Sequence, residues 1–222
     1  MLGFVFDLDD TLYAEQSYNF SGFDAVSEHV LQREGIAGLA DVCKELYSAG
    51  ARSNVFDVAT LRLNVKLPVA ELVEVYRAHR PRIELFEDAR WILDTVHGRH
   101  PIGLITDGYA GVQRKKVAAL GIAPLFDTVV FSDDFGRHAW KPSETPYREV
   151  MRRLADRANR FVYIGDNPKK DFVSARALGW LTVMVDRPTN VHRSDGLPAE
   201  HLAHHRITTL RDIPWNWLGT TP

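Results

Sequence analysis

The chain has 222 residues, of which 45% are apolar and 25% charged, and 27 basic side chains nearly balance 29 acidic ones for a formal net charge of −2. This charge excludes a general attraction to nucleic acid or anionic membranes, and no apolar run reaches the roughly 20 residues of a membrane span. The single cysteine, Cys43, cannot form an internal disulfide, which agrees with a reducing compartment. We therefore expect a cytoplasmic protein with neither nucleic acid nor membrane as a partner.

The first predicted strand lies in the stretch FVFDLDDTLY at residues 4–13, where an apolar run is followed directly by Asp7, Asp9 and Asp10. Carboxylates that are buried together at the end of a strand repel one another and lose their hydration. A cation or a reactive centre is therefore expected beside them.

The next section, from about Ser17 to Arg80, shows helical periodicity without a convincing strand. The predicted helices cover residues 17–34, 39–49, 55–65 and 69–79. The pattern predicts an all-helical domain at residues 15–81, inserted into a core formed by residues 1–14 and 82–222. Because the insert follows the carboxyl end of a strand, where α/β sheets bind ligands, we interpret it as a cap domain.

After the insert, short apolar runs alternate with helical segments. The predicted strands are IGLITD, DTVVFSD, FVYIGD and LTVMVD, and the helices between them include AGVQRKKVAALG, TPYREVMRRLAD and KDFVSARALG. Runs that are apolar throughout are typical of buried parallel strands. The sequence thus predicts an α/β protein, a doubly wound, Rossmann-like parallel sheet with a small all-helical cap.

Polar residues follow several of these strands at the point where each one ends. They are Thr106, Asp107 and Gly108 after one strand, Asp166 and Asp171 after another, and Lys141 on a loop that enters a helix. The carboxyl ends of neighbouring strands in an open α/β sheet share one crevice. We therefore expect these side chains to meet those that follow the first strand.

With these residues in order, the chain resembles the haloacid dehalogenase superfamily, specifically its phosphatase branch with a helical cap inserted after the first strand. The resemblance covers nearly the whole chain and is weakest in the cap and beyond about Asp186. Its four motifs are D-x-D-x-T from Asp7 to Thr11, the strand-closing hydroxyl of Thr106, the lysine Lys141, and G-D-x-x-x-x-D from Gly165 to Asp171.

The resemblance implies a Mg²⁺ site, and an oxygen-only set of ligands suits that ion. One oxygen of Asp7, the backbone carbonyl of Asp9 and the carboxylate of Asp166 would hold the ion. Asp171 would support the site from outside these ligands.

The resemblance also implies the chemistry. Asp7 would attack phosphorus to form an aspartyl-phosphate, and Asp9 would protonate the leaving oxygen and then deprotonate the attacking water. Phosphate donors would be Thr106, Lys141 and the backbone N–H groups around Asp107 and Gly108.

In capped members of the family, cap residues choose the leaving group. Here Tyr13, Arg52 and Asn54 are candidates, because a glycine-containing loop, SAGARSN, could point into the cleft. We expect a small-molecule phosphate ester such as a sugar phosphate or a nucleoside monophosphate. The sequence does not give the oligomeric state.

Three other functions use related residues. A phosphomutase has the same nucleophile, a 2-haloacid dehalogenase needs neither the metal nor the second aspartate, and a non-catalytic sensor of phosphometabolites would need no nucleophile. A separate cluster, His201, His204 and His205, suggests a metal site, but we interpret it as a polar surface segment with no strand to fix its geometry.

Overall fold

The computed structural model describes residues 1–188 and 190–221. The chain divides into two compact units, a core unit of Met1–Ala14 with Glu84–Pro222 and a helical unit of Glu15–Ile83. The chain returns to the core two residues later than the sequence pattern suggests. Arg82 still belongs to the helical unit, where its backbone N–H donates to Ser21 Oγ at 2.9 Å.

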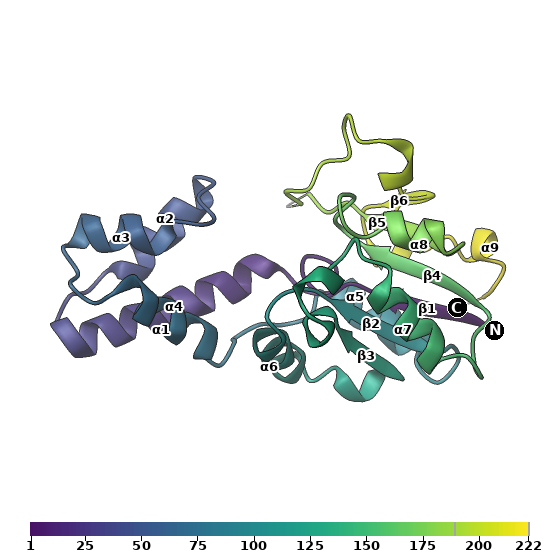
Figure 1. Cartoon of the computed structure of the whole chain (residues 1–222), viewed down its shortest axis with the longest axis horizontal. Coiled ribbons are helices and arrows are strands. Elements are labelled where there is room, and N and C mark those ends of the chain that lie inside the picture. The colour runs from purple at the N-terminus through teal and green to yellow at the C-terminus, as the bar shows by residue number, and fades with distance from the viewer. Residues whose placement is uncertain (189, 222) are drawn as a thin grey trace. The chain divides into compact units, whose positions relative to one another are not determined.

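The core unit is built on a parallel sheet (Figure 1). Its strands are β1 (Leu2–Phe6), β2 (Ile102–Thr106), β3 (Thr128–Phe131), β4 (Arg160–Gly165), β5 (Leu181–Val185) and β6 (His205–Ile207). Among the described residues the order is β3-β2-β1-β4-β5-β6, so β1 lies between β2 and β4. The predicted doubly wound parallel sheet is confirmed.

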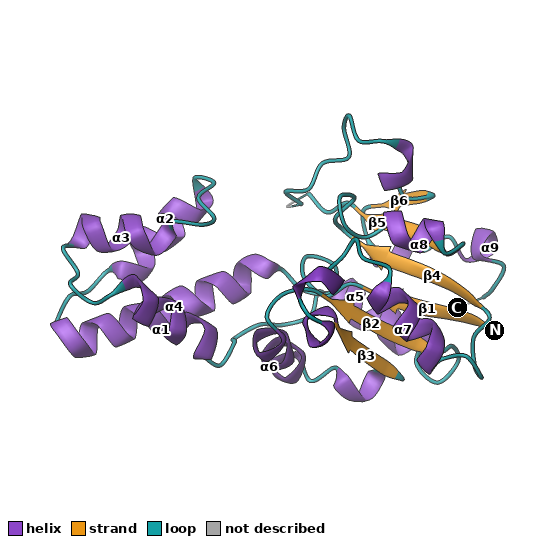
Figure 2. Ribbon diagram, viewed as in Figure 1, coloured by secondary structure: helices purple, strands orange, loops and turns teal. Residues whose placement is uncertain are grey.

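Helices cover both faces of this sheet. They are α5 (Glu87–Val96), α6 (Ala110–Leu120), α7 (Thr145–Arg153), α8 (Val173–Ala177) and α9 (Trp215–Leu218). Figure 2 shows α7 and α8 in front of the sheet and α5 behind it. Val5 of β1 packs in one core cluster with Val150 of α7 and Ala175 of α8. Phe4, which points to the other face, lies 5.7 Å from the ring of Trp215.

The strand β6 corrects one interpretation of the sequence, which placed the histidine cluster in a segment without a strand. His205 pairs with Val183 of β5, and the His204 ring nitrogen Nδ1 accepts the backbone N–H of Thr182 at 3.1 Å. These contacts give His204 and His205 structural roles, and the His201 ring nitrogen Nδ1 lies 3.1 Å from Pro168 O. A strand of three mostly polar residues gives too little alternation to be recognised.

The helical unit contains α1 (Glu15–Glu34), α2 (Leu39–Ser48), α3 (Val55–Leu63) and α4 (Val69–Ala78). It has its own apolar core, in which Phe23, Val26, Leu39 and Leu72 are buried. Cys43 is part of that core, and burial raises the pKa of its thiol to about 12, so it packs as an apolar residue. No helix in the described part of the chain is long and apolar enough to cross a membrane.

Candidate active site

Three neighbouring strands deliver the predicted site residues to one edge of the sheet. Asp7 directly follows β1, Thr106 is the last residue of β2, and Asp166 directly follows β4. The backbone N–H of Asp7 donates to Ile164 O at 2.9 Å, which ties the end of β1 to the end of β4. The parallel register thus places these side chains beside one another, as the sequence predicts.

A cluster of buried carboxylates occupies this edge. Asp7, Asp166 and Asp171 each offer one oxygen, and these three oxygens lie within 4.8 Å of one another. The ammonium of Lys141 donates to Asp7 Oδ1 at 2.5 Å and to Asp171 Oδ1 at 2.7 Å. Among the described residues, Lys141 is the only cation that an ion pair joins to these three carboxylates. Three acidic groups therefore face one compensating charge.

The pKa values report this imbalance. Burial raises the pKa of Asp7 to about 8. The attraction of Lys141 opposes this shift, and the repulsion of Asp171 adds to it. Burial likewise raises the pKa of Asp166 well above its ordinary value, and Asp171 and Asp7 add to the shift. Asp166 Oδ2 is buried and has no hydrogen-bond partner among the described residues. Oxygen ligands, excess negative charge and an unsatisfied carboxylate oxygen fit a hard divalent cation.

The loop that carries Lys141 is fixed by Asp107. Both carboxylate oxygens of Asp107 lie 3.1 Å from the backbone nitrogen of Lys141, and the hydroxyl of Ser132 donates to Oδ1. The Lys141 ammonium donates a third hydrogen bond to Tyr163 Oη at 3.0 Å. Burial opposes charge on Lys141, but the carboxylates of Asp171 and Asp7 outweigh it and raise the pKa of Lys141 well above its ordinary value. The lysine is therefore a fixed ammonium.

Two glycines allow the backbone geometry of the site. A Cβ on Gly165 would lie 2.5 Å from Asp171 Oδ2, so only glycine lets that buried carboxylate pack against the end of β4. Asp171 Oδ2 there accepts the backbone N–H of Asn167 at 2.8 Å. Gly108 has a φ of 111°, which disfavours a residue with a side chain, and it turns the chain from β2 towards α6.

Asp9 has surroundings that the sequence reasoning did not foresee. Its Oδ1 accepts from Lys116 Nζ at 2.7 Å and from the Tyr13 hydroxyl, and its Oδ2 accepts from Gln113 Nε2 at 2.8 Å. Burial acts to raise the pKa of Asp9, but Lys116 and the hydrogen bonds of Tyr13 and Gln113 outweigh it and lower the pKa. In this arrangement Asp9 is a carboxylate.

Gln113 also joins Asp9 to Thr106, because its amide nitrogen lies 2.5 Å from Thr106 Oγ1. The threonine oxygen accepts this bond, which leaves its own O–H free to donate to a ligand. Gln113 and Lys116 are three residues apart in α6 and both are buried. That spacing, which places two polar side chains on one face of a helix, is the signal that could have found them.

The three residues expected to select the substrate lie in different places. Tyr13 has no exposed surface and donates to Asp9 within the core unit, because its ring continues the apolar packing that follows β1. It therefore supports Asp9, and its role in substrate selection stays a prediction. Arg52 lines a cavity of the helical unit, whereas Asn54 is exposed and precedes α3.

This geometry agrees with the family assignment that sequence comparison provides. The profile of the haloacid dehalogenase-like hydrolases matches residues 4–185. The chain belongs to this family, and the resemblance inferred from its four motifs is confirmed. With relatives that are named phosphatases, it falls in the phosphatase branch.

Two curated relatives match most of the chain. A glyceraldehyde 3-phosphate phosphatase of Methanocaldococcus jannaschii is 28% identical and covers 82% of this chain and 84% of its own length. A ribulose-1,5-bisphosphate 5-phosphatase of Halopiger xanaduensis is 27% identical, and the match covers 94% of this chain and 96% of that protein.

Solved structures share the fold. A haloacid dehalogenase-type hydrolase of Bacillus subtilis, crystallised with magnesium, superposes with a TM-score of 0.65 at 17% identity and covers 98% of both chains.

Proposed function

We propose that this protein is a Mg²⁺-dependent phosphomonoester hydrolase that acts on a small phosphometabolite, such as a sugar phosphate or a nucleoside monophosphate, through an aspartyl-phosphate on Asp7. The observation that carries the proposal is the buried cluster of Asp7, Asp166 and Asp171 around the single ammonium of Lys141. Family membership and the phosphatases named among the relatives support the reaction class.

The cation would be held by one oxygen of Asp7, the backbone carbonyl of Asp9 and the carboxylate of Asp166, with Asp171 as outer support. When bound, Mg²⁺ would neutralise the carboxylates and the charge of a phosphoryl group. The unsatisfied Oδ2 of Asp166 and the raised pKa values of Asp7 and Asp166 support this assignment.

Asp7 is the nucleophile in this proposal. One carboxylate oxygen attacks phosphorus, the ester oxygen leaves, and water then attacks the phosphorus of the aspartyl-phosphate to release inorganic phosphate. Lys141 stabilises the carboxylate cluster, and the free O–H of Thr106 and the backbone N–H groups at Asp107 and Gly108 donate to phosphoryl oxygens. The hydrogen bond from Gln113 fixes the oxygen of Thr106 for this role.

Asp9 gives a proton to the leaving oxygen in the first step and accepts one from water in the second. The lowered pKa of Asp9 suits the second step, in which it is the base. For the first step Asp9 must hold a proton. At least one of the three hydrogen bonds that its carboxylate accepts therefore has to break. A dehalogenase would need neither Asp9 nor Asp166, and so these residues favour the phosphatase.

The helical unit, Glu15–Ile83, is assigned the role of a cap that selects the leaving group. It is inserted directly after the strand that carries the nucleophile, and it has an apolar core of its own. An insert with its own core can vary its surface without disturbing the catalytic sheet.

The test is a panel of phosphometabolites incubated with purified protein in Mg²⁺ and, separately, in a chelator. The expected result is release of inorganic phosphate from at least one ester in Mg²⁺, with loss in the chelator and recovery when Mg²⁺ is restored. Transfer of the phosphoryl group within the substrate, without release, would instead identify a mutase. Turnover that is indifferent to the chelator would contradict the metal assignment.

A further inference from the structure

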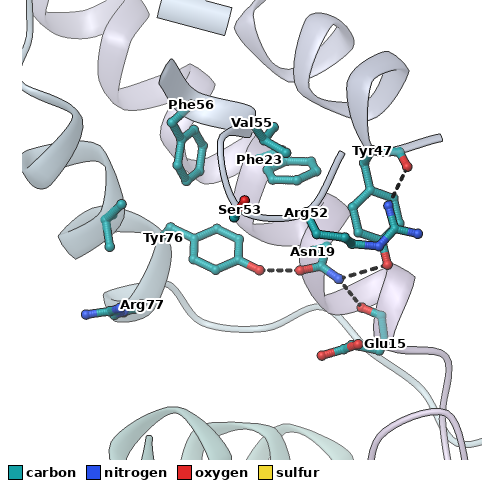
Figure 3. Close-up of a pocket in the computed structure, with 11 residues that line it drawn as sticks. Glu15, Asn19, Phe23, Tyr47, Arg52, Ser53, Val55, Phe56, Tyr76 and Arg77 are labelled. Carbon is teal, nitrogen blue, oxygen red and sulfur yellow. Dashed lines mark hydrogen bonds between the residues drawn. The ribbon is translucent and has the colours of Figure 1, made fainter. Parts of the chain in front are cut away.

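A cavity of about 310 Å³ lies within the helical unit, and every residue that lines it belongs to that unit. Its walls come from all four helices, α1, α2, α3 and α4, and from the segment between α2 and α3 (Figure 3). None of the strand-end residues described above lines this cavity. Its lining, however, combines aromatic rings with a small number of polar groups, which is the usual composition of a small-molecule site.

One wall is aromatic. The rings of Phe23 and Phe56 have centroids 5.8 Å apart, and Phe56 and Tyr76 lie 5.6 Å apart, both in edge-to-face contact. Tyr76 can approach α1 closely because position 22 is glycine, and a Cβ there would overlap its ring. These rings hold one another in place, so the apolar wall is formed before any ligand arrives.

The polar groups inside the cavity are also fixed in advance. Asn19 on α1 accepts from the Tyr76 hydroxyl, and its amide nitrogen donates to Tyr47 Oη at 3.2 Å and to Glu15 O at 3.1 Å. Figure 3 shows this chain of contacts running across the cavity from Tyr76 to Tyr47. Preorganisation of this kind reduces the entropy lost on binding.

Positive charge is available beside the rings. The Arg52 guanidinium lies 4.0 Å from the centroid of the Tyr47 ring, and its Nη1 donates to Tyr47 O at 2.7 Å and Ala51 O at 2.8 Å. Both backbone bonds use Nη1, so Nε and Nη2 can donate to an anion. Arg77 and Glu15 also line the cavity, so its lining contains two arginines and one carboxylate. The charge of the lining therefore favours an anionic ligand.

We propose that this cavity is a binding site for a planar organic anion, a ring system that carries a carboxylate or phosphate group. The ring would lie against Phe56 and Tyr76, and the anionic group would bind Arg52. An apolar cavity of roughly 150 Å³ takes up benzene, so about twice that volume has room for two fused rings or for one ring with a polar substituent. This binding role goes beyond the proposed phosphatase activity and does not rest on it.

The test uses the full-length chain and three probes in titration calorimetry. They are 2-naphthoate, which has both ring and charge, 2-naphthylmethanol, which has the ring alone, and acetate, which has the charge alone. Saturable binding of 2-naphthoate, with the other two probes weaker, is expected. No binding of 2-naphthoate, or equal binding of acetate, would overturn the site.

Two variants place the binding in this cavity. Arg52→Gln should weaken 2-naphthoate binding roughly tenfold, the value of one lost charge-assisted contact. Arg62→Gln is the matched control, because Arg62 is an exposed arginine of the same unit that does not line the cavity, and it should leave binding unchanged.

Ser53→Trp, at an exposed lining position, should fill the cavity and abolish binding while the melting temperature is retained. Equal losses in Arg52→Gln and Arg62→Gln would overturn the proposal.

The natural occupant could be part of a substrate or a separate ligand, and hydrolysis distinguishes the two sources. Either source supports the cavity as a site. If Ser53→Trp raises KM for 2-naphthyl phosphate but not for acetyl phosphate, the occupant is the leaving group. If it abolishes 2-naphthoate binding and changes neither KM, the occupant is a separate ligand. A chain that hydrolyses no ester would count against the phosphatase proposal, whereas calorimetry would still decide the cavity.

Discussion

The core unit and the helical unit both bring polar groups next to apolar packing, but they place charge differently. In the core unit, Asp7 and Asp171 are buried, and each forms an ion pair with the buried Lys141. In the helical unit, the exposed Arg52 lines a cavity that also has an aromatic wall. Burying charge is expensive unless the charges compensate one another. The core arrangement is therefore suited to reaction, and the helical one to binding.

The largest expected effect tests the reactive side of this contrast. Asp7→Asn retains the shape of the side chain but replaces a carboxylate nucleophile with an amide. We expect the protein to fold and turnover to fall by at least about 10⁴-fold, the scale seen when a nucleophile is removed. The measurement is phosphate release in Mg²⁺ by rigorously purified variant. Substantial residual activity would contradict covalent catalysis by Asp7.

The next effect concerns Asp9 and depends on the leaving group. An alkoxide is a strong base and needs a proton as it leaves, whereas p-nitrophenolate does not. Asp9→Asn should therefore slow release from a sugar phosphate by about 10²–10⁴-fold and release from p-nitrophenyl phosphate far less. Single-turnover release must be measured, because dephosphorylation also uses Asp9. Equal slowing of both esters would remove Asp9 as the acid.

The strand-end residues could be predicted because their chemistry is tied to position. An aspartate after an apolar run, such as Asp7, can be an ordinary strand-end cap, but four motifs in order after strands favour a catalytic site. Gln113 and Lys116 could not be recognised as easily, because QRKK in a helix resembles a solvated face, and only tertiary packing against Asp9 buries them. The cavity of the helical unit was not predictable, because residues such as Asn19 and Tyr76 meet only after the helices fold.

A third prediction tests whether buried charge in the core is compensated pair by pair. Lys116→Met leaves the Asp9 carboxylate without its ammonium, and breaking a buried pair in this way typically costs about 3–5 kcal/mol of unfolding free energy. Because the Asp9 side chain is 23% exposed, we expect the lower end of that range. The double variant Lys116→Met/Asp9→Asn should recover part of the loss in urea unfolding. No recovery would mean that Lys116 stabilises the fold independently of Asp9.

A smaller effect is a pH dependence of stability in the chelated protein. The folded pKa of Asp7, about 8, lies above its ordinary value of 3.8, so the folded state binds more protons between these values. The stability that Asp7 contributes is therefore present below about pH 4 and lost as the pH rises through about 8. The asparagine of Asp7→Asn cannot ionise. The melting temperature of this variant, relative to that of the unaltered protein, should therefore increase as the pH rises from about 4 to about 8. A difference that stays constant with pH would show that Asp7 is ionised throughout.

The most direct test of the catalytic account is to trap the phosphoryl group on the protein. Borohydride reduces an acyl phosphate to an alcohol, so quenching a single turnover with borohydride should convert Asp7 to homoserine. Peptide mass spectrometry should find this change at Asp7 only when both substrate and Mg²⁺ are present, and not in Asp7→Asn. Hydrolysis that proceeds under the same conditions without modification of Asp7, or with modification of another residue, would contradict the central claim.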